Sequence, residues 1–210
     1  MSSILSLIIL DSMNEITHFN QLDISKVYTY ADYYSWKFKE RVELIKGKVF
    51  KMSSAPRRVH QKVSMSLGAR LFNFFEEHSC EVYTAPFDVR FPTQNKTSDK
   101  TKTVLQPDIC VICDLEKLDD YGCFGAPDLI VEILSPSNSK KEMKYKYEIY
   151  EEAGVREYWI VNLVQKHTII YTLNEEGTFI GQKPVVEDAV LSSYIFPELK
   201  INQADIFKGI

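Results

Sequence analysis

The stretch from Val104 to Pro136 constrains this chain most, because it contains two short apolar runs that each carry one carboxylate. The runs read VLQPDICVIC and APDLIVEILSP, and their Ile- and Val-rich composition is typical of strands buried on both faces of a sheet. Asp108 and Glu132 stand where such strands normally have apolar residues. Because a buried charge is costly unless it is paired or bound to a metal, the two runs together indicate a functional site.

The remaining composition is that of one ordinary globular domain of 210 residues. The formal net charge of −4 gives no overall nucleic-acid signature, so such a function would depend on local basic patches. The apolar run at 4–10 is too short to span a bilayer and has no basic residue before it, unlike a signal peptide. We expect a cytoplasmic protein with no membrane segment, a partly disordered extension at 1–27 and a single domain at 28–210.

The cysteines give no strong evidence for a metal site or a disulfide framework. There are four of them, and in a chain of this length without a secretory signal we expect reduced thiols. Cys110 and Cys113 form a CxxC pair, but they lie inside the strand-like run ICVIC and no second pair follows at zinc spacing. We interpret them as small buried apolar residues.

Two segments have the three- and four-residue spacing of apolar residues that predicts amphipathic helices. The first covers residues 57–78. The second covers residues 139–153, with Ser137 or Ser139 as its N-cap and Gly154 at its end. Both are expected to cover faces of the sheet that contains the opening strands.

Most other apolar runs are predicted to be strands. A hairpin is expected around Lys46-Gly47, preceded by a short helix from Thr29, as N-cap, to about Glu40. A polar loop at 92–103 follows a strand at 81–91. Later strands are expected at 155–162, 167–173 and 178–182, with a short strand near Ile195 and a last helical turn. No repeat or linker divides the chain, which predicts one α/β domain.

If the two opening strands are neighbours, both carboxylates can converge on one point. Alternation places Asp108 on one face with Cys110, and Glu132 on one face with Ile130. Two carboxylates suit a hard divalent cation such as Mg²⁺, to which the carbonyl of Ile133 could add a third oxygen. The alternative is that Asp108 caps a turn while Glu132 pairs with a nearby Lys or Arg.

The helix at 139–153 adds a third unusual residue, Lys146, which lies within its inward stripe of Met143, Tyr147 and Tyr150. A lysine there could place its ammonium beside Glu132 and stabilise an anionic transition state. The alternative is a lysine whose stem packs while its head reaches solvent.

Two weaker candidates are Glu43, within the apolar run RVELIKG, and His60, near the start of the first long helix. Glu43 is either a further metal ligand or an exposed strand residue, and His60 is either a base or phosphate contact or a structural histidine. Basic residues gather at the starts of both long helices, where phosphates are favoured, although charge runs are usually just a solvated helix face: Arg57, Arg58, Lys62, Lys140, Lys141, Lys144 and Lys146.

Three segments, PDI, GAPDLIVEILSPS and KYEIYEEAGVREYWIVN, together closely resemble the Uma-type family of restriction-endonuclease-like proteins, within the PD-(D/E)xK nuclease superfamily. The resemblance covers roughly Tyr28 to Phe207 and includes VELIKGKVFKMSSAP and RRVHQ. It implies an α/β fold with a restriction-endonuclease-like mixed central sheet, flanked by the helices at 57–78 and 139–153, and a C-terminal antiparallel extension.

The resemblance also implies roles for the unusual residues. Asp108 would match the metal-binding Asp of the superfamily and Glu132 its second carboxylate. The position two residues later normally holds the lysine but is Leu134 here, and Lys146 matches a K-x-x-x-Y pattern with Tyr150 on the following helix. The resemblance thus implies that the lysine has moved from the strand to the helix.

Other matches are Glu43, in the ELI-x-G segment of the family, and the pair His60-Gln61. The chain departs from the common family pattern at three positions, none of which is a proposed ligand: Lys46, Ser66 and Asn162. These departures bear on substrate details more than on the metal site.

The resulting expectation is a Mg²⁺-dependent endonuclease that hydrolyses DNA, with Mn²⁺ able to substitute and a homodimer as the assembly. Asp108 and Glu132 would hold the metal, Lys146 would act at the scissile phosphate, and Glu43 would complete the site. Four residues are expected to bind substrate or support the site: Arg58, His60, Gln61 and Tyr150. The alternatives are a non-catalytic module that binds nucleic acid or protein, and a hydrolase of another phosphoester.

Overall fold

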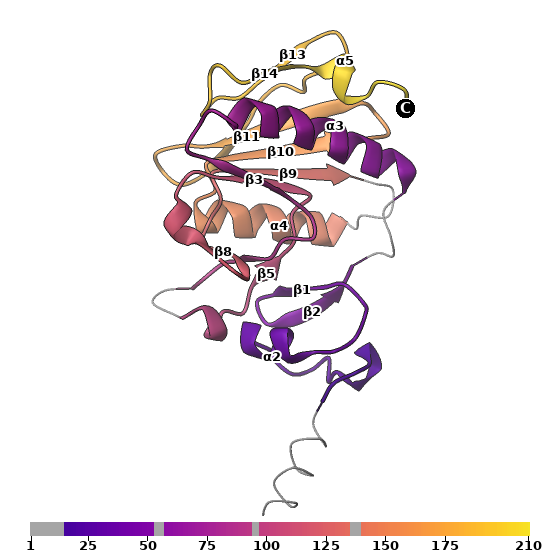
Figure 1. Cartoon of the computed structure of the whole chain (residues 1–210), viewed down its shortest axis with the longest axis vertical. Coiled ribbons are helices and arrows are strands. Elements are labelled where there is room, and N and C mark those ends of the chain that lie inside the picture. Colours follow the sequence, from indigo (N-terminus) through magenta and orange to yellow (C-terminus); the bar gives the residue numbers. More distant parts are fainter. Residues whose placement is uncertain (1–14, 53–56, 94–96, 135–139) are drawn as a thin grey trace, which may run out of the picture. The chain divides into compact units, whose positions relative to one another are not determined.

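A computed structural model describes residues 15–52, 57–93, 97–134 and 140–210, excluding the side chains of residues 140 and 141. The chain forms two compact units (Figure 1). The first unit consists of Met1–Ser54 and Pro92–Val104, and the second of Ala55–Phe91 and Leu105–Ile210. The predicted caps at Ser137 and Ser139, and most of the expected N-terminal extension, lie outside the described residues.

The first unit is built on a hairpin of β1 (Val42–Ile45) and β2 (Lys48–Lys51). The turn occurs where predicted, with Lys46 and Gly47 both at positive φ, which suits a tight two-residue hairpin connection. Leu44 of β1 also pairs with Val104 of β5 (Val104–Leu105). A small apolar core packs around these strands, with Leu22, Tyr28, Tyr30, Leu44 and Val104 as its buried members.

Helix α2 (Tyr30–Ser35) begins at the predicted cap but ends earlier than Glu40. Thr29 and Asp32 form a reciprocal capping box, so the helix start was correctly predicted. Trp36 and Phe38 both pack on the core, two residues apart. An extended chain satisfies that spacing and a helix does not, which explains the early end. Two 3₁₀ turns, η1 (Phe19–Gln21) and η2 (Ser98–Lys100), complete the unit.

The second unit contains a six-stranded mixed sheet in the order β12-β11-β10-β9-β6-β3. β9 and β10 are parallel neighbours, and every other adjacent pair in this sheet is antiparallel. Its strands are β3 (Glu81–Thr84), β6 (Ile109–Ile112), β9 (Leu129–Leu134), β10 (Glu157–Asn162), β11 (His167–Leu173) and β12 (Phe179–Gly181). The expected mixed α/β fold is confirmed.

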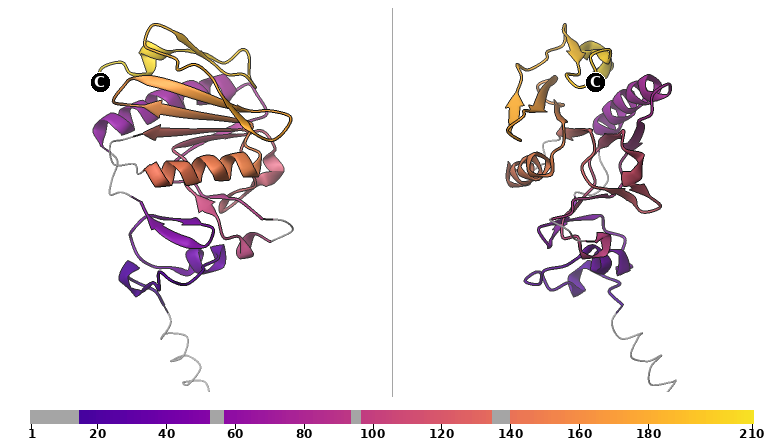
Figure 2. Two further views of the ribbon diagram at one scale, coloured as in Figure 1. Left: turned by 180° about the vertical axis from the view of Figure 1, so that it is seen from behind. Right: turned by 90° about the vertical axis from the view of Figure 1, so that its left-hand side faces the viewer.

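The two long helices lie on opposite faces of this sheet (Figure 2). Helix α3 (Arg58–Phe75) packs its stripe of Val63, Leu67 and Leu71 against alternate residues of the central strands. Helix α4 (Lys140–Ala153) connects β9 to β10 and packs against an aromatic group on the other face. Both predicted helices therefore exist. Neither α4 nor any other described helix combines the length and hydropathy that crossing a bilayer requires.

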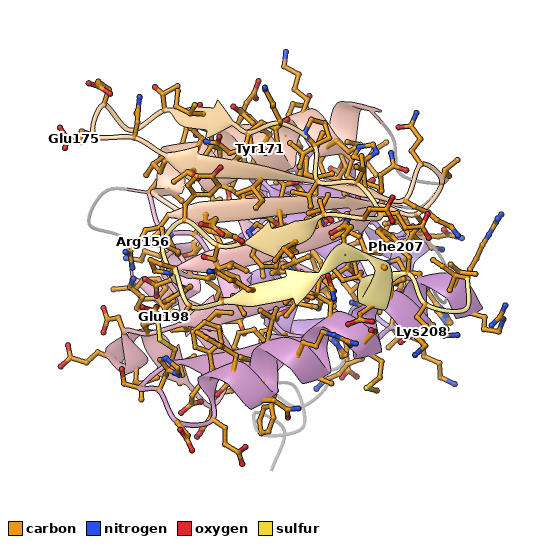
Figure 3. All side chains as sticks on the ribbon, turned by 90° about the horizontal axis from the view of Figure 1, so that it is seen from above. Arg156, Tyr171, Glu175, Glu198, Phe207 and Lys208 are labelled. Atoms are coloured by element: carbon orange, nitrogen blue, oxygen red, sulfur yellow. A yellow bond between two sulfur atoms is a disulfide. The ribbon has the colours of Figure 1, made fainter. Side chains whose placement is uncertain are left out.

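A C-terminal antiparallel pair, β13 (Val190–Ser192) and β14 (Lys200–Asn202), leads into α5 (Gln203–Ile206). Figure 3 shows this segment, with Phe207 after α5, beside α3. The buried carboxylate of Glu157 anchors the loop between β13 and β14: Oε1 accepts the indole N–H of Trp159, and Oε2 accepts the backbone N–H groups of Tyr194 and Ile195.

Two predicted strands are each divided in the structure. The run 81–91 forms β3 and, beyond Pro86, a separate strand β4 (Val89–Arg90). The run 104–113 forms β5 and β6, separated by a segment that contains Pro107. Proline lacks the N–H that a central strand donates, and this explains both interruptions. β4 pairs with β8 (Gly122–Phe124), which pairs with β7 (Leu118–Asp119), after a 3₁₀ turn η3 (Leu115–Lys117).

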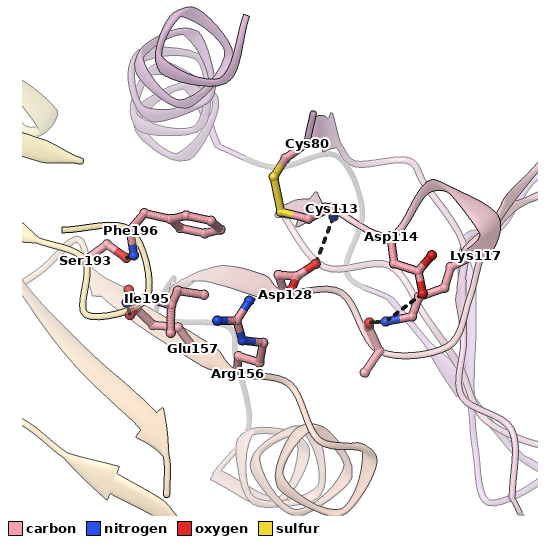
Figure 4. Close-up of polar contacts among 11 residues, drawn as sticks. Cys80, Cys113, Asp114, Lys117, Asp128, Arg156, Glu157, Ser193, Ile195 and Phe196 are labelled. Atoms are coloured by element: carbon pink, nitrogen blue, oxygen red, sulfur yellow. Dashed lines mark hydrogen bonds and ion pairs between the residues drawn. A yellow bond between two sulfur atoms is a disulfide. The ribbon is translucent and has the colours of Figure 1, made fainter. Parts of the chain in front are cut away.

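Cys80 and Cys113 form a disulfide, so the expectation of reduced thiols is wrong for this pair (Figure 4). Glu81 of β3 is paired with Ile112 of β6, and one further step of this register brings the two cysteines opposite each other, with Cα atoms 3.9 Å apart. The bridge depends on strand pairing rather than on CxxC spacing. Cys110 is free and buried, as predicted for a small apolar residue, and Cys123 is also free and buried.

Candidate functional site

The register between β6 and β9 brings the two predicted carboxylates together. Ile109 is paired with Val131, and Cys110 with Ile130. One further step of this antiparallel register places Asp108 opposite Glu132. Asp108 itself is in a bend just before β6, so it is not a residue inside a buried strand as expected. The two strands are nevertheless adjacent in the sheet, as predicted.

Asp108 is held through one carboxylate oxygen. Its Oδ2 accepts the backbone N–H of Ile133 at 2.7 Å and lies 3.3 Å from Nε2 of His60. The backbone carbonyl of Asp108 accepts the N–H of Ala85. The side chain is 19% exposed, and no hydrogen bond from a described residue reaches Oδ1. One oxygen of Asp108 is thus available to a ligand while the other is fixed.

Glu132 is nearly buried, at 6% exposure, and is held by two donors from α4. Its Oε1 accepts the ammonium of Lys146 at 2.9 Å and the hydroxyl of Tyr150 at 2.6 Å. Lys146 is itself only 5% exposed, so its head does not reach out to solvent. The interpretation that Lys146 points inward beside Glu132 agrees with this geometry.

Helix α4 delivers both donors because Lys146 and Tyr150 are four residues apart and share one helix face. The ring of Tyr150 is completely buried between those of Phe91 and Tyr158, at 5.7 and 5.1 Å between centroids. Burial raises the pKa of Tyr158 well above its usual range. The Glu132–Lys146 pair therefore lies against apolar and neutral rings, where electrostatic interactions are stronger than in water.

His60 reaches the same site from the first turn of α3, on the face of the sheet opposite α4. Burial lowers the pKa of His60, but the hydrogen bond to Asp108 and the charges of Asp108 and Glu132 raise it, and the net direction is upward. Its Nδ1 is buried and has no hydrogen-bond partner among the described residues. The sequence placed His60 near a helix start but did not predict its contact with Asp108.

The donors at this site fit a hard divalent cation better than a soft one. Mg²⁺ in proteins is typically held by one or two carboxylates and keeps several waters, which matches Asp108 and Glu132. No group of three or more His, Cys, Asp or Glu side chains among the described residues has the arrangement of a metal site. Burial raises the pKa of Cys123 to about 12 and that of Cys110 well above its usual range, which disfavours either cysteine as a thiolate ligand of a metal.

The other predicted residues belong to β1 and to the start of α3. Glu43 is a buried residue of β1 in the first unit. Arg58 and Gln61 are exposed on the first turns of α3. Lys62 donates to the carbonyl of Gly209, and Lys144 pairs with a glutamate on its own helix, so these two basic residues already have partners within the chain.

A second Pro-Asp pair, at Asp128, has a structural role that sequence reasoning did not single out. Its Oδ2 accepts the backbone N–H of Cys113, and its Oδ1 pairs with Arg156 at 3.0 Å (Figure 4). Asp128 precedes β9 as Asp108 precedes β6, but the two strands are antiparallel, so the two aspartates lie at opposite ends of the pair. Because both aspartates follow a proline and precede an apolar strand, the local sequence alone does not show which of them lies beside Glu132.

Known proteins resemble this chain in sequence and in fold. A family profile described as "Uma2: Putative restriction endonuclease" matches residues 30–204. An uncharacterized protein of Synechocystis sp. is 24% identical over 153 residues, covering 71% of this chain and 76% of that protein. The crystal structure of a putative nuclease belonging to DUF820 from Anabaena variabilis superposes with a TM-score of 0.65 at 18% identity, covering 85% of this chain and 97% of the other. The family match spans most of the residues, and the chain belongs to the Uma2 family of putative restriction endonucleases.

Proposed function

We propose that this protein is a Mg²⁺-dependent endonuclease that hydrolyses phosphodiester bonds in DNA. The observation that carries the proposal is the pair Asp108, just before β6, and Glu132 on β9, which the strand register places opposite each other, with the buried ammonium of Lys146 bonded to the second carboxylate. Membership of a nuclease family supports the same reaction class.

Asp108 and Glu132 would hold the metal, with the carbonyl of Ile133 as a further oxygen ligand. When bound, Mg²⁺ supplies Lewis-acid activation of water and neutralises charge on the scissile phosphate. The hydrogen bonds to Oδ2 would fix Asp108, and those to Oε1 would orient Glu132. Mn²⁺ should substitute, because it accepts the same oxygen ligands.

Lys146 would place positive charge beside the reacting phosphate. Its stem is immobilised by burial on α4, so little freedom is lost when the phosphate binds. The exposed Arg58 and Gln61, at the N-terminal end of the long helix α3, would meet the phosphate backbone, where helix N–H groups and the dipole favour anions. We also propose a homodimer, since two centres suit cleavage of two strands.

Plasmid nicking in Mg²⁺ or Mn²⁺ tests the proposal directly. The wild type is compared with Asp108→Asn, which keeps the size of the side chain but loses a charged ligand. Asp120→Asn is the matched control, because Asp120 is exposed in the turn between β7 and β8. We expect nicking by the wild type and Asp120→Asn but not by Asp108→Asn. Equal behaviour of all three proteins would refute the catalytic proposal.

A second candidate is a non-catalytic module that keeps the fold and binds nucleic acid or protein. The observation that favours it is that Lys146 and Tyr150 already compensate the buried charge of Glu132 within the chain. Titration of Mg²⁺ by calorimetry distinguishes the two candidates. A nuclease should show binding that Glu132→Ala abolishes, and a pure binding module should show none.

A further inference from the structure

We infer that His60 is a positioning residue for Asp108, which fixes one carboxylate oxygen so that the other is presented to the cation. The inference rests on the proposed function, and adds to it a role for a residue of α3. The contact that carries it joins Nε2 of His60 to Oδ2 of Asp108 at 3.3 Å.

The ring of His60 is held rigidly by the helix that bears it. His60 begins the apolar stripe that continues through Val63 and Leu67, both completely buried against the sheet. Its own side chain is only 13% exposed. Burial of the imidazole limits its freedom to turn away from Asp108, so its hydrogen bond is preorganised.

Two donors converge on the same oxygen of Asp108. The N–H of Ile133 approaches Oδ2 from the neighbouring strand, and His60 approaches it from the helix. Oδ1 accepts no hydrogen bond from any residue in the described ranges. Donors that hold one oxygen of a ligating carboxylate orient the other one toward the metal, which is how outer partners tune metal sites.

The unpaired nitrogen of His60 argues against a purely structural role. A proton on Nε2 is needed to donate to Asp108, so in the neutral ring Nδ1 is a bare acceptor. That atom is buried and lacks a partner among the described residues. A leucine would extend the apolar stripe without burying an unpaired polar atom, so the presence of a histidine calls for an explanation, which its hydrogen bond to Asp108 supplies.

Titration of the full-length protein with Mn²⁺ alone, followed by calorimetry, tests this role. His60→Leu fills the stripe but has no donor, whereas His60→Gln can place an amide N–H near the position of Nε2. His60→Asn has the same amide on a side chain too short to reach Asp108. His78→Leu is the matched control, since His78 is an exposed histidine just beyond the end of α3.

We expect His60→Leu and His60→Asn to weaken Mn²⁺ binding about tenfold to a hundredfold, His60→Gln to recover most of the affinity, and His78→Leu to bind as the wild type does. Unchanged affinity in His60→Leu, or no difference between the Gln and Asn variants, overturns the inference while the proposed function stands. If His60→Leu does not fold, the comparison of Gln with Asn decides. Absence of any Mn²⁺ binding that Asp108→Asn abolishes would overturn the metal site and this inference together.

Discussion

The ammonium of Lys146 lies 2.9 Å from Oε1 of Glu132, and both side chains are almost completely buried. The two buried charges neutralise each other, and removing either partner would leave the other charge buried and unpaired. The pair therefore links the stability of the fold to the chemistry proposed for the site.

Lys146→Met should destabilise the protein by about 3–5 kcal/mol, because it leaves an ionised Glu132 buried without its cation. The free energy of unfolding is measured by urea denaturation. The control is Lys144→Met, which breaks an exposed pair with Glu148 on the same helix and should cost at most ~0.5 kcal/mol. The double variant Glu132→Gln/Lys146→Met should recover part of the loss, and failure to do so would contradict charge pairing as the cause.

Tyr150→Phe should cost about 1.5–3 kcal/mol, since it removes a hydroxyl that donates to the buried carboxylate of Glu132. Tyr147→Phe, three residues earlier on α4, removes a half-buried hydroxyl that makes a long 3.5 Å hydrogen bond to the carbonyl of Phe179 and interacts with Glu151. Its effect should be clearly smaller in the same unfolding measurement. An equal decrease in the free energy of unfolding in both variants would show that the hydrogen bond to Glu132 contributes no more to stability than the one to Phe179.

Glu157→Gln should destabilise the C-terminal extension by about 1–3 kcal/mol. Both oxygens of the carboxylate accept N–H groups, and an amide has only one oxygen, so at least one N–H would face the amide NH₂. Hydrogen exchange of the backbone amides of Tyr194 and Ile195 is the sensitive readout. The exposed Glu198→Gln in the same loop is the control, and similar exchange in both variants would exclude the anchoring role.

Cys110 and Cys123 should resist iodoacetamide at pH about 8 in the folded protein. Their pKa values are raised, and a thiol below its pKa is protonated and weakly nucleophilic, so labelling should fall far below that of an ordinary thiol. Peptide mapping by mass spectrometry should show both labelled only after unfolding, and Cys80 and Cys113 only after reduction. Rapid labelling of Cys123 in the native protein would contradict the raised pKa.

The parts of the site that could be predicted are those that follow from local periodicity. Alternation along a strand put Asp108 and Glu132 on converging faces, and helical spacing put Lys146 on the inward face of α4. The structure agrees with both because burial of the apolar partners in these elements leaves only one orientation. Whether these residues perform the proposed chemistry stays a prediction.

The parts that could not be predicted depend on how distant segments pair. The contact of His60 with Asp108 requires the docking of α3 on the sheet, and the Cys80–Cys113 bridge requires the register of β3 and β6. The small strands β7 and β8 have two and three residues, too few for an alternating pattern to be visible. Pro107 lies between β5 and β6, but the apolar run at 104–113 was predicted as one continuous strand because of its length.

The disulfide has a consequence for how the protein should be handled. Strand β6 has four residues and is roughly 13 Å long at 3.3 Å per residue. Asp108 lies just before it and the disulfide-bonded Cys113 just after it. A reducing buffer therefore acts at one end of β6, whereas Asp108, the proposed metal ligand, lies at the other end. We expect reduction to lower the thermal stability. If the proposed metal site exists, Mn²⁺ affinity should change less, because Asp108 and the bridge lie at opposite ends of β6.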